Sequence, residues 1–384
     1  MANSRAPQRE RNQSTELDRR FMAAAVALGR RHSGLSRPAP SVGAIMVMKS
    51  EAGFEVIARA VTGPGGQAQA EAQLLAAAGP RAKGATVYLT MEPRAHSSVG
   101  VPSAELLVRA GVAHVVTAIN DPDPKLSGRG HALLTRNRVV VTTGVLADEG
   151  RRLHAGHIAR ARFDRPHVNL SLAISADGCI GREGEGQLAI SCPQAKAYTL
   201  GLRVEHDAIL IGVGTVVNDD PQLTNRLPGC DGRNPVRVIL DAEARTPLGA
   251  KLVASAGKTP TWVFVAPGAP EERVRALTRH GVLVEVAERD HAGRLDLGDV
   301  LFQLGRLGIT SLISEGGARV ARALIESDHV DEATLTFSDI KVGAGGVKAL
   351  AGLPLDVLTQ SEGFAAIERR RLGVDRLVRY WRAD

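Results

Sequence analysis

A glutamate and two glycines at positions 315–317 have the spacing of a phosphate-binding turn. They follow an apolar run that predicts a strand over residues 312–314, and they precede a run with helical periodicity. The first N–H groups of a helix have no partner inside it, and the helix dipole places partial positive charge there, so this turn suits a pyrophosphate. A plain strand-to-helix turn is a more common reason for Gly-Gly here, and both interpretations stay open at this stage.

The composition is that of a soluble protein of two domains. The chain has 384 residues, of which 44% are apolar and 23% charged, and this excludes a disordered chain. Its 41 Gly and 19 Pro follow no period, which excludes a collagen-like protein. The net charge of +7 comes from scattered arginines, and aromatic residues make up only 3%. We therefore expect no nucleic-acid partner, and an anionic small substrate is favoured.

The cysteines and the termini indicate a cytoplasmic protein. Cys179, Cys192 and Cys230 are far apart and odd in number, which is typical of a reducing compartment. The first twenty residues are polar and charged, without the apolar core of a signal peptide. No apolar run approaches the length that spans a bilayer, so we expect no membrane partner.

The elements that must position such residues alternate between strands and helices. Residues 1–14 are predicted to be a disordered tail, followed by the alanine-rich helix LDRRFMAAAVALGRR. SVGAIMVMKS and FEVIARAVTG predict two strands, AEAQLLAAAG a helix and ATVYLTMEP a buried strand. A charged connector closes this domain, which we place at residues 15–160. The pattern predicts an α/β domain with a mainly parallel sheet.

A second α/β domain is predicted over residues 161–384. Its strands include HVNLSLAIS, HDAILIGVG, VRVILDA and TWVFVA, and GITSLIS follows the helical pattern of DVLFQLGRL. The last segment, FAAIERRRLGVDRLVRYWRA, predicts an antiparallel pair of strands.

Two segments of the first domain have the pattern of a zinc deaminase. Such enzymes bind zinc with three protein ligands, leave a fourth position to water, and transfer the proton through a glutamate. That glutamate lies two residues after the His ligand, and the first Cys ligand follows Glu-Pro. GGQAQAEAQLL and YLTMEPRAHSSVGVPSAELL reproduce this layout. Together with FMAAAVAL, SVGAIMV and DPDPKLSGRG, they resemble the deaminase half of the bifunctional deaminase/reductase family of riboflavin biosynthesis.

The three zinc ligands that the resemblance implies are all replaced. Gln69 stands in place of the family's His, Arg94 in place of the first Cys and Ser103 in place of the second. An amide, a guanidinium and a hydroxyl cannot form a tight zinc site. We therefore expect neither zinc nor deamination, with Glu71 as a remnant that has no metal-bound water to deprotonate. An ion pair between Arg94 and Glu71 in the former metal site is a hypothesis.

The second domain resembles the reductase half of the same family. The resemblance rests on RPHVNLSLAISADGCIG, LGLRVEHDAILIGVGTVVNDDPQLTNRLPG, VRVILDAEARTPL and LISEGGARVARALI, which occur in the family's order. It implies a cytidine-deaminase-like αβα domain followed by a dihydrofolate-reductase-like α/β domain. It also implies NADPH as cofactor, a phosphorylated pyrimidine as substrate, and a homodimer formed through the reductase domain.

The resemblance also assigns site residues. The matching substrate-binding positions are Arg203, Leu223, Arg226 and Glu315. The matching cofactor-binding positions are Ala173, Thr215, Asp219, Gly316 and Gly317, and Asp219 is the catalytic candidate near the sugar C1′. A guanidinium suits a phosphate or a uracil carbonyl, although Arg203 could instead end a helix favourably against its dipole.

The reaction that the family implies is the reduction of 5-amino-6-(5-phosphoribosylamino)uracil to its ribitylamino product. Ser171 replaces the family's usual Lys in the first strand, and Gly186 departs from its usual Ser. Because of these departures, a reductase of a related pyrimidine or pterin stays open as an alternative. Two further alternatives are a non-catalytic partner of an active paralogue and a full bifunctional enzyme that retains deamination.

Overall fold

A computed structural model describes residues 6–96, 100–186, 188–230 and 232–383. Its contacts divide the chain after Phe163 into an N-terminal unit and a C-terminal unit. The expected boundary lay at residue 160, three residues earlier. Each unit is described below by itself.

The N-terminal unit is built on one mixed sheet. Its strands are β1 (Gly43–Ser50), β2 (Gly53–Val61), β3 (Thr86–Leu89), β4 (His114–Thr117) and β5 (Val140–Thr142). Their order is β2-β1-β3-β4-β5. The pairs that β1 makes are antiparallel and those among β3, β4 and β5 are parallel, so the expected parallel sheet is found only in the second half of this unit.

Helices cover both faces of this sheet, as the predicted three-layer architecture requires. They are α1 (Ala6–Arg31), α2 (Ala70–Ala78), α3 (Ser103–Arg109), α4 (Arg129–Arg136), α5 (Ala147–Leu153) and α6 (Ala155–Phe163). Met22 of α1 packs with Ile45 on one face, while Leu74 of α2 and Leu107 of α3 pack with Met46 on the other. These neighbouring residues of β1 thus pack against opposite helical layers, because side chains alternate along a strand.

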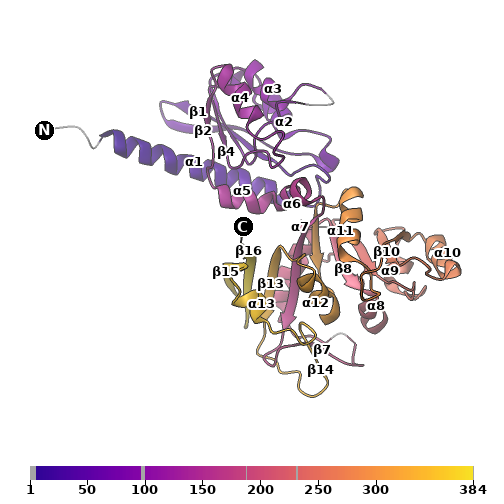
Figure 1. Cartoon of the computed structure of the whole chain (residues 1–384). Coiled ribbons are helices and arrows are strands. Elements are labelled where there is room, and N and C mark those ends of the chain that lie inside the picture. Colours follow the sequence, from indigo (N-terminus) through magenta and orange to yellow (C-terminus); the bar gives the residue numbers. More distant parts are fainter. Residues whose placement is uncertain (1–5, 97–99, 187, 231, 384) are drawn as a thin grey trace. The chain divides into compact units, whose positions relative to one another are not determined.

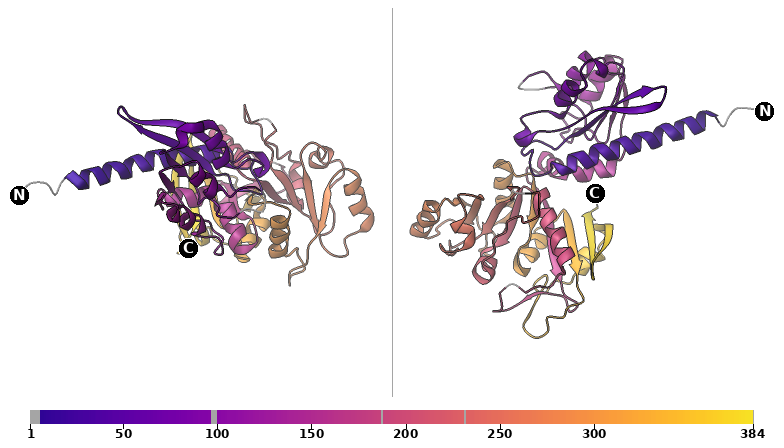
Figure 2. Two further views of the ribbon diagram at one scale, coloured as in Figure 1. Left: turned by 90° about the horizontal axis from the view of Figure 1, so that it is seen from above. Right: turned by 180° about the vertical axis from the view of Figure 1, so that it is seen from behind.

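The helix α1 corrects one prediction. It begins at Ala6 and continues without a break to Arg31 (Figures 1 and 2), so residues 6–14, predicted to be disordered, are helical. Residues 1–5 lie outside the described residues. Residues 8–13 contain Gln, Arg and Glu, which are good helix formers, and Pro7 lies in the first turn, where proline is tolerated.

The C-terminal unit is built on a sheet of nine strands in the order β11-β10-β9-β8-β12-β6-β13-β16-β15. The strands are β6 (His167–Ile174), β8 (Ala208–Gly212), β9 (Val236–Leu240), β10 (Thr261–Val265), β11 (Leu283–Val286), β12 (Ser311–Ser314), β13 (Glu332–Phe337), β15 (Phe364–Leu372) and β16 (Asp375–Arg382). Those from β11 to β13 run parallel, and β15 and β16 form the predicted antiparallel pair. A separate ribbon pairs β7 (Cys179–Arg182) with β14 (Gly346–Lys348).

Helices cover both faces of this sheet as well. They are α7 (Pro193–Glu205), α8 (Val213–Asp219), α9 (Lys251–Ala254), α10 (Glu271–Arg279), α11 (Leu297–Arg306), α12 (Ala318–Glu326) and α13 (Asp356–Thr359). Leu210 and Leu312 pack with α11 and α12 on one face, whereas Ile209 and Ile313 pack with α7 and α8 on the other. Parallel strands covered on both faces need nearly continuous apolar sequences, which explains AILIG and SLIS.

Candidate active site

A cavity of about 2040 Å³ lies within the C-terminal unit, where its parallel strands end. Ligands of open α/β sheets bind outside the carboxyl ends of the strands, so this position is the expected one. All the residues predicted to bind substrate or cofactor line the cavity: Ala173, Arg203, Thr215, Asp219, Leu223, Arg226, Glu315, Gly316 and Gly317. Ser171 and Gly186, where the chain departs from the family pattern, line it too.

The glycine turn brings two helix starts together at the cavity. β8 and β12 are parallel neighbours, and α8 and α12 begin just after them. A Cβ atom on Gly316 would lie 2.8 Å from Val320 Cβ, and one on Gly212 would lie 3.0 Å from Val320 Cγ2. Only glycine therefore fits this approach. A Cβ on Gly317 would lie 3.7 Å from Thr215 Oγ1, so this turn, Thr215 and the first N–H groups of α12 share one corner.

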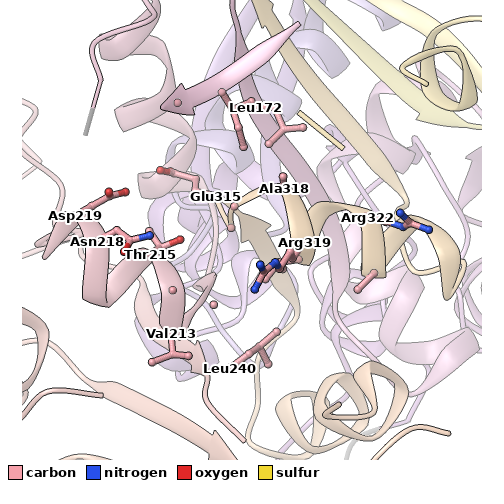
Figure 3. A pocket seen from close by; sticks show the side chains of 18 of the residues that line it. Leu172, Val213, Thr215, Asn218, Asp219, Leu240, Glu315, Ala318, Arg319 and Arg322 are labelled. Atoms are coloured by element: carbon pink, nitrogen blue, oxygen red, sulfur yellow. The ribbon is translucent and has the colours of Figure 1, made fainter. Parts of the chain in front are cut away.

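Two arginines of α12 add positive charge beside that turn, and sequence reasoning missed both. Figure 3 shows Arg319 and Arg322 projecting from α12, while Thr215, Asn218 and Asp219 project from α8. Arg319 is exposed and has no ion-pair partner among the described residues. Arg322, in contrast, donates to Glu326 Oε1 at 2.8 Å and to the Ala351 carbonyl at 3.0 Å. Of the two arginines of α12, Arg319 is thus the one available to a ligand.

Arg203 and Glu315, both predicted to contact substrate, bind each other. Arg203 Nε donates to Glu315 Oε1 at 2.7 Å and Nη2 donates to Oε2 at 2.6 Å. Burial alone would lower the pKa of Arg203, but the hydrogen bonds and charge of Glu315 raise it. Arg203 lies in the last turn of α7, as the alternative of a helix-dipole role requires, and its charge is also paired with a carboxylate in the cavity wall.

The segment after α8 carries the remaining predicted residues. Asp220 ends α8, and its Oδ1 accepts a hydrogen bond from the Lys251 N–H at 2.9 Å at the start of α9. Leu223 is buried and has a left-handed backbone with φ of 51°. Arg226 is exposed at the cavity, and Asp219 has a pKa raised by burial. Arg226 and Asp219 thus place a cation and an acid at the same cavity as the apolar side chain of Leu223.

The N-terminal unit brings together residues at positions that match the family's zinc site. Gln69 is the residue before α2, Glu71 lies in its first turn, and Ser103 begins α3. Ser103 Oγ accepts the Arg94 N–H at 2.9 Å, and a hydrogen bond from the Ser103 side chain also reaches Glu71. Burial, the largest influence, raises the pKa of Glu71. Ser103 therefore bridges the Glu71 side chain and the backbone of the first ligand position.

The hypothesis of an Arg94–Glu71 ion pair is wrong. Among the described residues, no ion pair joins these two, and the Arg94 side chain is exposed while Glu71 is only 6% exposed. Arg94 acts on the pKa of Glu71 only as the smallest influence. Within the same described residues, His, Cys, Asp and Glu side chains nowhere form a group of three able to hold a metal ion.

Comparisons with known proteins agree with this arrangement. Residues 166–369 match the family model described as the RibD C-terminal domain. The chain is 34% identical over 353 residues to riboflavin biosynthesis protein RibD of Bacillus amyloliquefaciens, covering 91% of this chain and 89% of the relative. It is 32% identical over 371 residues to the Escherichia coli K12 protein of the same name, covering 93% and 97%.

Two solved structures share the fold along most of the chain. Acinetobacter baumannii RibD, form 1, has a TM-score of 0.82 at 28% identity and covers 96% of this chain and 100% of its own. A diaminohydroxyphosphoribosylaminopyrimidine deaminase/5-amino-6-(5-phosphoribosylamino)uracil reductase from Thermotoga maritima has a TM-score of 0.81 at 28% identity, with the same coverage. In the part of the chain that the structure describes, no helix is both long and apolar enough to cross a membrane.

Proposed function

This chain belongs to the RibD family of riboflavin biosynthesis proteins, and on that premise we propose that it reduces 5-amino-6-(5-phosphoribosylamino)uracil but has lost deaminase activity. The protein is an NADPH-dependent oxidoreductase, and its reductase motif residues line one large cavity. The presence of these motif residues around a single cavity is the main support for the proposed reduction. At the other site, the positions of the three zinc ligands hold Gln69, Arg94 and Ser103.

The residues of the cavity fit a dinucleotide cofactor. Gly316 and Gly317 would hold the pyrophosphate at the N-terminus of α12, where the helix dipole favours negative charge. Thr215 would donate its hydroxyl hydrogen beside them, Arg319 would bind a further anionic group, and Ala173 would contribute a backbone contact. When bound, NADPH supplies the hydride that reduces C1′ of the substrate's ribose.

The substrate would lie between the segment after α8 and the pair Arg203–Glu315. Arg226 would bind a phosphate or a uracil carbonyl, for which its planar fork is suited. Leu223 would form the wall of the pocket, and Glu315 would accept a hydrogen bond from the pyrimidine while Arg203 holds its carboxylate in place. Burial raises the pKa of Asp219, which favours its use as a proton donor near the sugar.

Loss of deamination follows from the chemistry of the N-terminal site. Zinc activates the attacking water in this class of reaction, and three good ligands are needed to hold it. Gln69, Arg94 and Ser103 offer an amide, an exposed guanidinium and a hydroxyl that is already engaged. Glu71 has the position of the proton-transferring acid, but nothing supplies the activated water. We therefore propose that the N-terminal unit binds no zinc.

The proposal is tested by NADPH oxidation with the deaminated pyrimidine as substrate and no added zinc. Wild-type protein should turn over steadily, and Arg226→Ala should raise the substrate KM by about 10- to 100-fold with little change in the KM for NADPH. Arg306→Ala, an exposed change on α11, serves as the matched control. Absence of turnover by folded protein would contradict the proposed reaction.

One alternative rests on a specific feature of the cavity. Ser171 and Gly186 line it in place of the family's usual Lys and Ser, so the pocket could select a related pyrimidine. A panel of phosphorylated pyrimidines and pterins assayed with NADPH separates the two proposals. We also propose a homodimer through the C-terminal unit, as the family resemblance implies, which sedimentation would test.

A further inference from the structure

Arg237 is a buried guanidinium without a carboxylate partner. It lies on β9, is 0% exposed and has no ion pair among the described residues. Burying a charge costs several kcal/mol unless hydrogen bonds compensate for the lost water. Burial lowers its pKa only to about 10, so it stays protonated at neutral pH. Such a costly residue needs a role that an apolar strand residue could not fill.

The guanidinium connects three separate segments. Nη2 donates to the carbonyls of Leu252 at 2.9 Å and Thr259 at 2.6 Å, and Nη1 donates to Ser255 Oγ at 2.7 Å. These acceptors belong to α9 and to the turn before β10. Nη1 also donates to the carbonyl of Gln222 at 3.3 Å. Arg237 therefore ties the segment after α8 to the rigid sheet and helix behind it.

The segment that Arg237 holds is the one with the left-handed residue. Leu223 follows Gln222 and has φ of 51°, a strained conformation for a non-glycine residue that persists only when its surroundings impose it. The next carbonyl, that of Thr224, accepts a hydrogen bond from Arg203 Nη1 at 3.3 Å. The carbonyls on both sides of Leu223 are thus held by guanidinium groups, one from β9 and one from α7.

We propose that Arg237 is a positioning residue that holds residues 222–226 in the conformation that presents Leu223 and Arg226 to the cavity. The expected effect of Arg237 on substrate affinity rests on the proposed function, whereas its expected effect on the conformation of residues 222–226 does not. Arg237 does not line the cavity, so it acts through the backbone of Gln222 and not through the ligand. Loss of the Arg237 side chain should therefore displace the substrate-binding residues Leu223 and Arg226 while leaving the glycine turn at α12 in place.

The test compares Arg237→Lys and Arg237→Met in the full-length protein by hydrogen exchange and by kinetics. The N–H groups of Asn225 and Leu227 are bonded to Asn234 Oδ1 and Asn225 Oδ1, so the peptide over residues 222–227 reports the loop. Arg379→Met is the control, because it removes a half-buried guanidinium of the same unit that pairs with Glu332 away from the cavity.

In Arg237→Met we expect faster exchange over 222–227, and a substrate KM raised by about 10- to 100-fold with the NADPH KM changed less than about twofold. Arg237→Lys keeps the charge but has fewer hydrogen-bond donors, so its exchange rate and substrate KM should lie between those of wild type and Arg237→Met. If Arg237→Met does not fold, Arg237→Lys is compared with wild type alone. Exchange in this peptide no faster than in Arg379→Met would overturn the proposal. Wild-type protein without turnover would contradict only the proposed reaction, because exchange still reports the loop.

Discussion

The guanidinium of Arg203 and the carboxylate of Glu315 face each other with two parallel hydrogen bonds, at 2.7 and 2.6 Å, in the wall of the cavity. The two residues come from α7 and from the end of β12, 112 positions apart in the sequence. Their side chains are only 13% and 16% exposed, so the pair is largely removed from water. The carboxyl group of Glu315 therefore meets a ligand in a fixed orientation.

This pairing predicts strong coupling between the two positions. Glu315→Gln leaves Arg203 without its counter-charge, and Arg203→Lys loses the two-point contact, so each should lower kcat/KM by about 100-fold. The kcat/KM of the double variant should lie no more than about tenfold below that of the less active single variant, because both changes remove the same interaction. Additive losses in this double-mutant cycle would show that the residues act independently.

Arg319 should determine cofactor affinity. As an exposed cation beside the glycine turn, it should attract an anionic group of the dinucleotide. Arg319→Ala should raise the NADPH KM by about tenfold, and the difference from wild type should shrink at high salt because the interaction is screened. Arg306→Ala provides the control. An unchanged NADPH KM would remove Arg319 from the cofactor site.

Restoring the ligands should restore zinc binding. Ser103 bonds to the backbone N–H of Arg94 and to the side chain of Glu71, so two of the three expected ligand positions lie close to each other and to the acid. Wild-type protein should contain no stoichiometric zinc by elemental analysis, and the combined variant Gln69→His, Arg94→Cys, Ser103→Cys should bind about one ion per chain. Stoichiometric zinc in the wild-type protein would contradict the account of this unit.

The buried His154 and the half-buried His157 should make the N-terminal unit sensitive to acid. Burial, the largest influence, lowers the pKa of His154 to about 3 and that of His157 to about 4, from 6.5. Between these values and 6.5, the unfolded chain binds protons that the folded unit does not. The unfolding free energy should therefore be fully present above pH 6.5 and fall as the pH drops, by ~1 kcal/mol per pH unit for each imidazole.

The pH dependence is measured by thermal unfolding of the full-length protein between pH 7 and pH 4.5. His154→Gln should flatten the dependence of the N-terminal transition, because Nε2 of His154 contacts Thr90 Oγ1 in the buried core of that unit. His280→Gln, at an exposed position of the other unit, is the control. An unchanged slope in His154→Gln would show that this histidine titrates alike in both states.

The sequence predicted the cavity because its motifs lie at the ends of parallel strands. The turn at Gly316 and the motif containing Thr215 follow β12 and β8, and the carboxyl ends of neighbouring parallel strands must meet. Local sequence also predicted the terminal hairpin. It could not predict that Arg203 binds Glu315, because nothing within either segment reports a partner 112 positions away.

Other features were missed for related physical reasons. Arg319 follows the predicted glycine turn by two residues, so the helix start could have drawn attention to it, but a surface arginine carries no signal of its own. Arg237 lies in the apolar run VRVIL, where an arginine would be expected to point to solvent. Its burial depends on carbonyls from three other segments, which only the tertiary structure brings together.

The most direct test supplies the two pyrimidines separately to the purified protein, with zinc available in the buffer, and follows NADPH oxidation. The account predicts steady oxidation with 5-amino-6-(5-phosphoribosylamino)uracil and none with diaminohydroxyphosphoribosylaminopyrimidine, until a zinc-containing deaminase is added in trans. Oxidation with the undeaminated pyrimidine, accompanied by release of ammonia, would contradict it by showing that the N-terminal unit is an active deaminase.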